Sequence, residues 1–128
     1  MTYCVGLLLN EGIVMLSDTR TNAGLDNIAT YRKMFHFENP GERVITIVTA
    51  GSLSVTQTTI ARLREAVEGI DANGETSIMK APTMLKVASL IGDTLCKVRL
   101  EIDEKLATMK QGASASMIVG AQRRGGPM

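Results

Sequence analysis

The chain has 128 residues, of which 45% are apolar and 21% charged, and its formal net charge is +1. This length suits a single domain covering residues 1–128. The charge balance argues against nucleic acid as a partner, because no basic surplus is left to neutralise phosphates. No apolar run has the length of a membrane span and no signal-like segment opens the chain, so we expect no membrane partner and a cytoplasmic location.

Two cysteines and one histidine limit the metal and redox chemistry. Cys4 and Cys96 are too far apart in sequence to form a metal-binding pair, so reduced, buried thiols are expected, with a disulfide as the alternative. Because His36 is the only histidine, a His-rich metal site is excluded, and we expect this side chain on a strand surface. No metal and no cofactor are expected.

The first part of the chain predicts a β-hairpin. Apolar residues fill 3–9 and 13–16, and the turn-forming sequence Asn-Glu-Gly at 10–12 separates them. Neither run alternates cleanly between apolar and polar residues, so we expect both faces of the hairpin to be covered. The polar segment 17–24 follows, and 26–32 is expected to form a loop or short irregular structure.

Two further strands are predicted around a tight turn. Residues 33–38 alternate weakly between apolar and polar side chains, and the turn-forming sequence Asn-Pro-Gly-Glu occupies 39–42. Residues 44–49 are β-branched at every position, which makes them the clearest strand in the chain. This strand ends at the sequence Ala-Gly-Ser, residues 50–52.

Two helices are expected next. Ser52 or Ser54 could cap the first, whose apolar stripe consists of Ile60, Leu63, Val67 and Ile70. A polar link over 71–80 leads to a second helix from Pro82 to Lys110, which would be roughly 43 Å long. Its stripe, which suits a core or a subunit interface, consists of Met84, Ala88, Ile91, Leu95, Val98, Ile102, Leu106 and Met109.

The sequence ends with a strand predicted at 116–121 and turn chemistry at 123–127. A strand that leads into a turn without a following strand lacks a hairpin partner, so we expect a truncated chain. Half of a layered structure would expose one sheet face and the long helix. Such exposure would cause poor solubility or tight self-association.

The order of these elements and several short motifs resemble Anbu, the bacterial proteasome-related ancestral β subunit, which is related to HslV and to proteasome β subunits. The resemblance covers the whole chain but only about the first half of such a subunit. It implies an α+β fold, a four-layer α-β-β-α sandwich of the N-terminal nucleophile hydrolases, in a bacterial protein. The motifs are TYCVGL (2–7), SDTRTNAG (17–24), DNIAT (26–30), RKM (32–34), PGER (40–43) and TAG (49–51).

The resemblance also implies a catalytic site. Thr2 would become the nucleophile once Met1 is removed, with Asp18 and Lys33 as a charged pair beside it. Arg20 would buttress this pair, and the Gly51 amide would bind the oxyanion. The residues expected to bind substrate are Thr21, Asn22, Thr49 and Leu53.

The chemistry of these residue types supports such a site. A Thr hydroxyl is a weak nucleophile and needs a base, and a free α-amine with a pKa of about 7.7–8.0 supplies one near neutral pH. A lysine ammonium favours the developing alkoxide, and a carboxylate holds that lysine in place. While Met1 remains, the nitrogen of Thr2 is an amide and cannot act as the base.

Taken singly, each residue also has an ordinary explanation. Asp18 and Arg20 could form a surface ion pair of little energetic value. Lys33 could be solvated, Gly51 could be a turn residue, and Cys4 could be a small apolar filler.

Three functions are therefore considered. The first is a threonine-type peptidase that acts on a peptide or protein substrate through an acyl-enzyme on Thr2. The second is a non-catalytic subunit of a homo-oligomeric ring or open ring, with the long helix as interface. The third is hydrolysis of a small-molecule amide by the same site.

Overall fold

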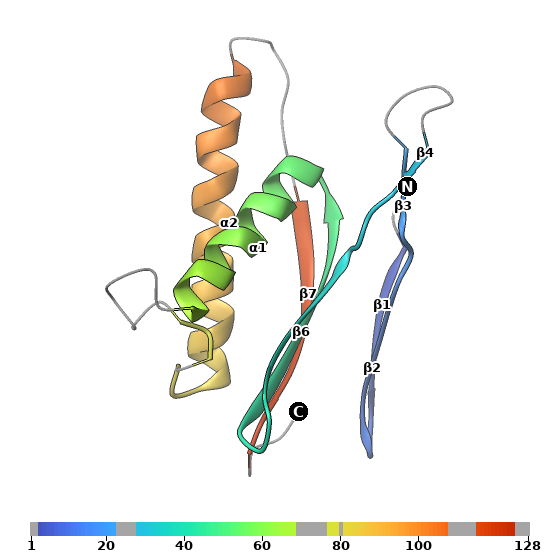
Figure 1. The fold of residues 1–128 in the computed structure, drawn as a ribbon, viewed down its shortest axis with the longest axis vertical. Coiled ribbons are helices and arrows are strands. Elements are labelled where there is room, and N and C mark those ends of the chain that lie inside the picture. Colours follow the sequence, from blue (N-terminus) through green and yellow to red (C-terminus); the bar gives the residue numbers. More distant parts are fainter. Residues whose placement is uncertain (1–2, 23–27, 69–76, 80, 108–114, 125–128) are drawn as a thin grey trace. The chain divides into compact units, whose positions relative to one another are not determined.

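The computed structural model describes residues 3–22, 28–68, 77–79, 81–107 and 115–124, without the side chains of residues 20–22, 28–30 and 105–107. This part of the chain is a mixed α+β structure with two helices (Figure 1). Its strands are β1 (Cys4–Leu9), β2 (Gly12–Ser17), β3 (Arg20–Asn22), β4 (Ile28–Thr30), β5 (Met34–Asn39), β6 (Arg43–Gly51) and β7 (Ala115–Arg123). The helices are α1 (Leu53–Val67) and α2 (Met84–Ala107). Two compact units result, one formed by Met1–Ala50 with Ser116–Met128 and the other by Gly51–Ala115.

The first unit contains small antiparallel sheets. β1 and β2 form the predicted hairpin, with Cys4 opposite Ser17 and Leu9 opposite Gly12. β5 and β6 form a second hairpin around the predicted turn, where Gly41 has a φ of 81° that favours glycine. β7 joins this sheet beside β6, and the amide of Arg124 donates to the carbonyl oxygen of Glu42, so the end of β7 lies next to the start of β6.

The β1–β2 hairpin packs on β7 through a close approach at two glycines. A Cβ atom at Gly6 would lie 3.2 Å from the sulfur of Met15, and one at Gly120 would lie 3.1 Å from the same sulfur. Both distances are tighter than ordinary contacts, so the Met15 side chain occupies the space that side chains at these positions would need. Ile13 and Ile118 complete this contact. Small residues on facing strands thus allow the two sheets to pack closely.

The opposite face of the hairpin is exposed, so the prediction that both faces are covered is wrong for the described chain. Leu7 and Leu9 are about half exposed, at 51% and 52%, and so are Val14 and Leu16, at 49% and 58%. The antiparallel register places Leu7 opposite Val14, and side chains alternate between faces along a strand, so these four share one face. The other expectation, an exposed apolar sheet face, is confirmed.

β6 supplies the buried strand of the first unit. Ile45 and Ile47 are fully buried, Val48 is 1% exposed, and Phe37 on β5 is also buried. β-Branched side chains suit a pleated surface that is covered by other residues. The predicted strands 33–38 and 44–49 are confirmed, and β6 is longer than predicted because it continues to Gly51.

The sequence prediction missed a third antiparallel pair, formed by the short strands β3 and β4. β3 and β4 pair antiparallel, with Arg20 opposite Thr30 and Asn22 opposite Ile28. The prediction of irregular structure over 26–32 is therefore wrong for 28–30. Each strand has only three residues, which is too short for an apolar period of two to be recognised.

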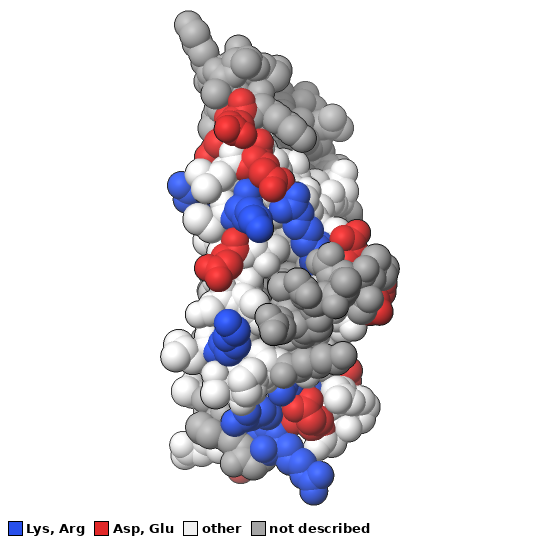
Figure 2. All heavy atoms as spheres, turned by 90° about the vertical axis from the view of Figure 1, so that its left-hand side faces the viewer, with Lys and Arg blue, Asp and Glu red and all other residues white. Residues whose placement is uncertain are grey.

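In the second unit, α1 and α2 pack against each other (Figure 1). Val55 of α1 and Val98 of α2 are fully buried, and the partly buried residues packed around them are Leu95, Ile102 and Ala115. Neither described helix is long and apolar enough to cross a membrane. On the face that Figure 2 shows, basic side chains are interleaved with acidic ones, and the Arg62–Glu101 ion pair connects the two helices.

Both helices differ in detail from their predictions. Ser52 occupies the N-cap position of α1, but its side chain makes no capping hydrogen bond and lies 3.1 Å from the Ser54 hydroxyl instead. The buried face of α1 consists of Val55, Thr56, Thr59, Ile60, Leu63 and Ala66. α2 begins at Met84, after Pro82, and its 24 residues make it roughly 36 Å long. On α2, Val87 is buried in place of the predicted Ala88, whereas Ile91 and Val98 are buried as predicted. Ile70, Met109, Lys110 and the side chain of Leu106 lie outside the described residues.

The two cysteines are free thiols, as expected, but they are not both buried. Cys96 on α2 is exposed and Cys4 is partly buried. The expected position of His36 on a strand surface is confirmed, because its side chain is 53% exposed on β5.

Burial of Leu63 is expected to contribute to the stability of the helical unit. Leu63 on α1 is 2% exposed, whereas Leu100 on α2 is 59% exposed. Leu63→Ala should lower the free energy of unfolding by about 2–5 kcal/mol, because it removes buried methylene contacts and leaves a cavity. The same change at Leu100 should stay within about 0.5 kcal/mol. Urea denaturation measures both, and equal losses would contradict the assignment of the core.

Candidate functional site

Asp18 connects the start of the chain to the region before β5. It follows β2 directly, and its amide donates to the carbonyl oxygen of Tyr3 at 3.0 Å. Its Oδ1 accepts from the Tyr3 amide at 3.2 Å and from the Lys33 ammonium at 2.9 Å. One carboxylate oxygen therefore holds both the backbone next to Thr2 and the charged end of Lys33.

Lys33 brings a buried positive charge to this place. Its side chain is 6% exposed, whereas that of Asp18 is 32% exposed. Removing an ammonium from water is costly unless an opposite charge and hydrogen bonds compensate. The ordinary explanation, a solvated lysine, is therefore wrong, and Asp18 provides an opposite charge at the site.

The pKa of the Asp18 carboxyl is lowered from its ordinary value. The main cause is the hydrogen bond from the Lys33 side chain, and the hydrogen bond from the Tyr3 amide lowers the pKa further. Both contacts stabilise the ionised form of the carboxyl group. Asp18 is thus a carboxylate at neutral pH, and it keeps the site electrostatically paired.

Thr49 fixes the backbone of Lys33. Its amide donates to the carbonyl oxygen of Lys33 at 2.9 Å, and its hydroxyl donates to the same oxygen at 3.3 Å. The Thr49 side chain is 3% exposed. Its hydroxyl is thus directed at the Lys33 backbone, while the predicted contact of Thr49 with substrate stays a prediction.

Cys4 extends this network to the carbonyl oxygen of Thr49. Its thiol donates to the carbonyl oxygen of Thr49 at 3.4 Å, so it is more than the apolar filler that the sequence suggested. Burial raises the pKa of the Cys4 thiol, the Asp18 charge raises it further, and the Lys33 charge opposes them. The thiol form is favoured, which makes Cys4 a hydrogen-bond donor within the site.

The remaining predicted site residues are distributed as follows. Gly51 is the last residue of β6, and its φ of 104° is a conformation that favours glycine. Leu53 is the first residue of α1. The backbones of Arg20, Thr21 and Asn22 form β3, and their side chains lie outside the described residues. Thr2 also lies outside the described residues.

The sequence prediction missed the contacts of Tyr3, Cys4 and Thr49. Two of them, Tyr3 with Asp18 and Thr49 with Lys33, follow from the registers of the two hairpins. The register of the β5–β6 hairpin pairs Met34 with Val48, and one step further it places Lys33 opposite Thr49. The register of the β1–β2 hairpin pairs Cys4 with Ser17. One step further, Tyr3 lies opposite Asp18, as their two backbone contacts show.

Within the described part of the chain, no three His, Cys, Asp or Glu side chains gather to form a metal-binding group. The chemistry that this arrangement offers is that of an ammonium and a carboxylate next to the chain start. It suits activation of a neighbouring hydroxyl or amine group by charge.

No protein-family model and no curated protein match this chain, but solved structures do. Over 99% of this chain, the helical assembly of the Anbu complex from Pseudomonas aeruginosa is 37% identical, with a TM-score of 0.86. An Anbu mutant from Hyphomicrobium sp. strain MC1 is 33% identical over 98% of this chain, with a TM-score of 0.80. Anbu, the ancestral beta-subunit, from Yersinia bercovieri is 31% identical over 98%, with a TM-score of 0.78.

The match covers only part of these solved chains. It spans 50%, 48% and 49% of their respective lengths, so this chain has about half the length of the structures that it resembles. The predicted resemblance to Anbu is confirmed, and so is its extent over about half of such a subunit.

The Asp18–Lys33 pair predicts how stability depends on pH. The folded-state pKa of Asp18 is lowered. Its contribution to the free energy of unfolding is therefore fully present above the ordinary carboxyl pKa of about 3.9, and it is lost as the pH falls through the folded-state pKa. The difference in unfolding free energy between wild type and Asp18→Asn should be constant near neutral pH and shrink below about pH 4. Urea denaturation across this range measures it. The exposed Asp93→Asn is the control, and a pH-independent difference for Asp18→Asn would contradict the pairing.

The Thr49 hydroxyl is expected to stabilise the fold through Lys33. Thr49→Val keeps the side-chain shape but removes the donor to the Lys33 carbonyl oxygen, and should cost about 0.5–1.5 kcal/mol of unfolding free energy. Thr58→Val on α1 is the matched control, because no hydrogen bond of the Thr58 side chain is found in the described structure. Thermal or urea unfolding compares the two, and equal effects would show that the hydroxyl contributes nothing specific.

Proposed function

From the similarity of this chain to Anbu over almost its whole length, we propose that it forms part of an N-terminal threonine hydrolase of the proteasome type, which cleaves peptide or amide bonds. One observation carries the proposal beyond the similarity itself. The Asp18 carboxylate binds both the Lys33 ammonium and the amide that links Tyr3 to Thr2. A buried cation is thereby held at the carboxylate that also binds the amide of Tyr3, the residue that follows the proposed nucleophile in the sequence.

In the proposed reaction, the Thr2 hydroxyl attacks the substrate carbonyl carbon after Met1 has been removed. The free α-amine of Thr2 accepts the hydroxyl proton and later returns a proton to the leaving amine. The peptide bond breaks and an ester between Thr2 and the acyl group forms. Water then attacks this ester, which releases the acid and restores the hydroxyl.

Lys33 and Asp18 have separate roles in this proposal. The Lys33 ammonium favours the negatively charged form of the neighbouring hydroxyl, because opposite charges at short range stabilise each other. Asp18 holds the ammonium at 2.9 Å and balances its charge. Thr49 restrains the Lys33 backbone through its hydroxyl, so that the cation is fixed before substrate arrives.

The other residues of the proposed site rest on the resemblance. The Gly51 amide would stabilise the oxyanion, and its left-handed φ of 104° suits a position that a substrate backbone approaches closely. Arg20 would support the Asp18–Lys33 pair. The first substrate pocket would be formed by Thr21, Asn22, Thr49 and Leu53.

The four-layer α-β-β-α sandwich belongs to this proposal as well. Two observations support it. The β1–β2 hairpin packs on β7 through the contact of Met15 with Gly6 and Gly120, which is one sheet on another. The outer face of the hairpin, with Leu7 and Leu16, is apolar and exposed, and an additional layer would cover such a face.

A second candidate is a non-catalytic subunit of a homo-oligomer. One solved structure that this chain resembles is a helical assembly of the Anbu complex, and the exposed apolar hairpin face would favour self-association.

We propose a cytoplasmic location for either function, and a peptide or protein as the substrate of the hydrolase. Hydrolysis of a small-molecule amide remains the third candidate.

Labelling of Thr2 distinguishes the first two candidates. An electrophile directed at N-terminal threonine should acylate the wild-type protein and fail to label Thr2→Ala, because that change removes the attacking oxygen. Thr2→Ser, which keeps a hydroxyl, should retain labelling, and Thr19→Ala is a control at an exposed threonine. Intact mass, before and after the reagent, gives both the removal of Met1 and the adduct.

Undiminished labelling of Thr2→Ala would refute the hydrolase proposal. A protein that keeps Met1 and is not labelled, but forms a defined oligomer, would favour the assembly subunit. A folded state equal to wild type by circular dichroism is required of each variant in this comparison.

A further inference from the structure

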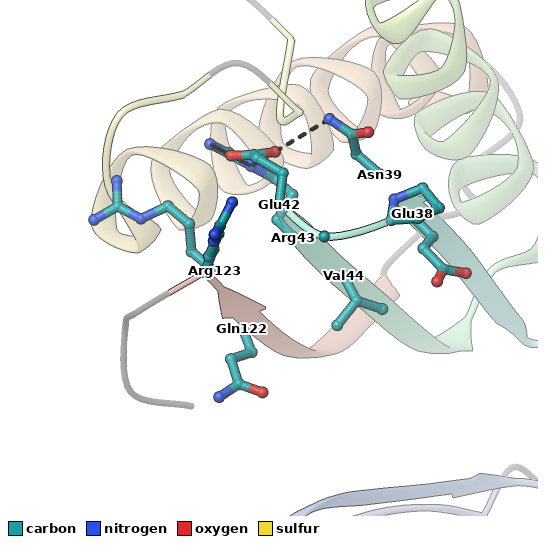
Figure 3. A pocket seen from close by; sticks show the side chains of 10 residues that line it. Glu38, Asn39, Glu42, Arg43, Val44, Gln122 and Arg123 are labelled. Atoms are coloured by element: carbon teal, nitrogen blue, oxygen red, sulfur yellow. Dashed lines mark hydrogen bonds and ion pairs between the residues drawn. The ribbon is translucent and has the colours of Figure 1, made fainter.

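A polar hollow of about 280 Å³ lies at the end of the first unit's three-stranded sheet. The β5–β6 turn forms one side and the end of β7 forms the other. Figure 3 shows Glu42 and Arg43 at the turn, with Arg123 beside them at the end of β7. The proposed catalytic pair is distant, because Lys33 precedes β5 and the turn follows it, which separates them by roughly 20 Å along the strand.

Glu42 organises the backbone and side chains around this hollow. Its amide donates to the carbonyl oxygen of Asn39 at 3.0 Å, and its own carbonyl oxygen accepts from the Arg124 amide. Its carboxylate accepts from the Arg43 Nε at 2.8 and 2.9 Å and from the Asn39 amide group at 3.4 Å. The turn and the end of β7 are therefore held together before any ligand binds.

Arg43 forms the buried part of the hollow. Its side chain is only 4% exposed, and its Nη2 lies 2.8 Å from the Glu42 carboxylate. A guanidinium and a carboxylate in this paired geometry neutralise each other. Glu42 and Arg43 thus act as a rigid, charge-balanced base for the residues around them.

The charges of the other residues that line the hollow do not cancel. Arg123 and Arg124 bring two positive charges, and neither guanidinium forms an ion pair or side-chain hydrogen bond with another described residue. Glu38, the other acidic residue of the lining, is 53% exposed and lies 3.2 Å from the His36 ring. The hollow therefore carries a net positive charge once Glu42 and Arg43 are paired.

The pKa of Glu42 agrees with this distribution of charge. It is lowered mainly by the hydrogen bonds from Arg43, and the charge of Arg123 lowers it further. Arg123 is therefore near enough to influence a carboxylate in the hollow, and its guanidinium remains available to a second anion.

We propose that this hollow binds a small oxyanion, a carboxylate or phosphate group, between the guanidinium groups of Arg123 and Arg124. Guanidinium groups suit such ligands because their N–H donors match pairs of oxygen atoms. The paired Glu42 and Arg43 position the turn, and the two free arginines supply the charge. This site is independent of the proposed hydrolase activity.

Calorimetric titration of the full chain with inorganic phosphate, and separately with acetate, tests the proposal at constant ionic strength. We expect saturable binding of one anion per chain in at least one titration. Binding of phosphate alone would identify a phosphate group as the ligand, and comparable binding of acetate would identify a carboxylate. Arg123→Gln with Arg124→Gln should weaken the affinity about tenfold or more, because two charge-assisted contacts are lost.

The control variant, Lys86→Gln with Lys97→Gln, removes two exposed cations from α2 and should change the affinity less than about twofold. The single variant Arg124→Gln, at an exposed position, keeps the test valid if the double variant fails to fold. Equal weakening by the arginine and lysine variants would reveal non-specific attraction and overturn the proposal. So would binding that the arginine variants leave unchanged, or no saturable binding by about 10 mM.

Discussion

The buried ammonium of Lys33 is the constraint around which the first unit is arranged. A side chain with 6% exposure and a full charge must have an opposite charge in contact. Asp18 meets this need from the end of β2 and at the same time binds the Tyr3 amide. The start of β1, the end of β2 and the approach to β5 are thereby held at one point. The outer face of the β1–β2 hairpin is exposed. The contacts of Asp18 therefore help to hold the hairpin in place where β1 begins and β2 ends.

Close packing of small residues fixes the hairpin at a second point. The Met15 sulfur lies where side chains at Gly6 and Gly120 would otherwise be, so the hairpin and β7 approach each other more closely than larger residues would allow. The two contacts differ in kind. The polar contact determines which charged groups face the chain start, and the apolar contact determines the spacing of the sheets.

The two ends of β5 carry ion pairs with different physical properties. At one end Lys33 is buried against the partly exposed Asp18, whose carboxylate also binds the Tyr3 amide. At the other end the buried Arg43 is paired with Glu42 inside a tight turn, and two further arginines remain beside it. In the proposed functions, the first pair would help to activate the Thr2 hydroxyl, and the second would support anion binding.

The sequence by itself determined the order of most elements, because apolar runs, turn residues and β-branched positions depend on local physical chemistry. It predicted the hairpin around 10–12, the strands 33–38 and 44–49 on either side of the turn at 39–42, the strand 116–121 and both helices, and through its motifs the resemblance to Anbu. The three-residue strands β3 and β4 were missed, since so few residues carry no measurable period. The predicted coverage of both hairpin faces was wrong, since an apolar run shows which residues favour burial but not whether a layer is present to bury them.

Only the tertiary structure decided how the site residues are connected. The resemblance to Anbu implied that Asp18 and Lys33 form a charged pair, but not that one oxygen atom of Asp18 would bind both Lys33 and the Tyr3 amide. Nor did it reveal that Thr49, expected to contact substrate, directs its buried hydroxyl to the Lys33 backbone. These contacts join residues 15 or 16 positions apart. Such contacts depend on strand register and on burial of the charge, which are properties of the folded chain and not of any local sequence pattern.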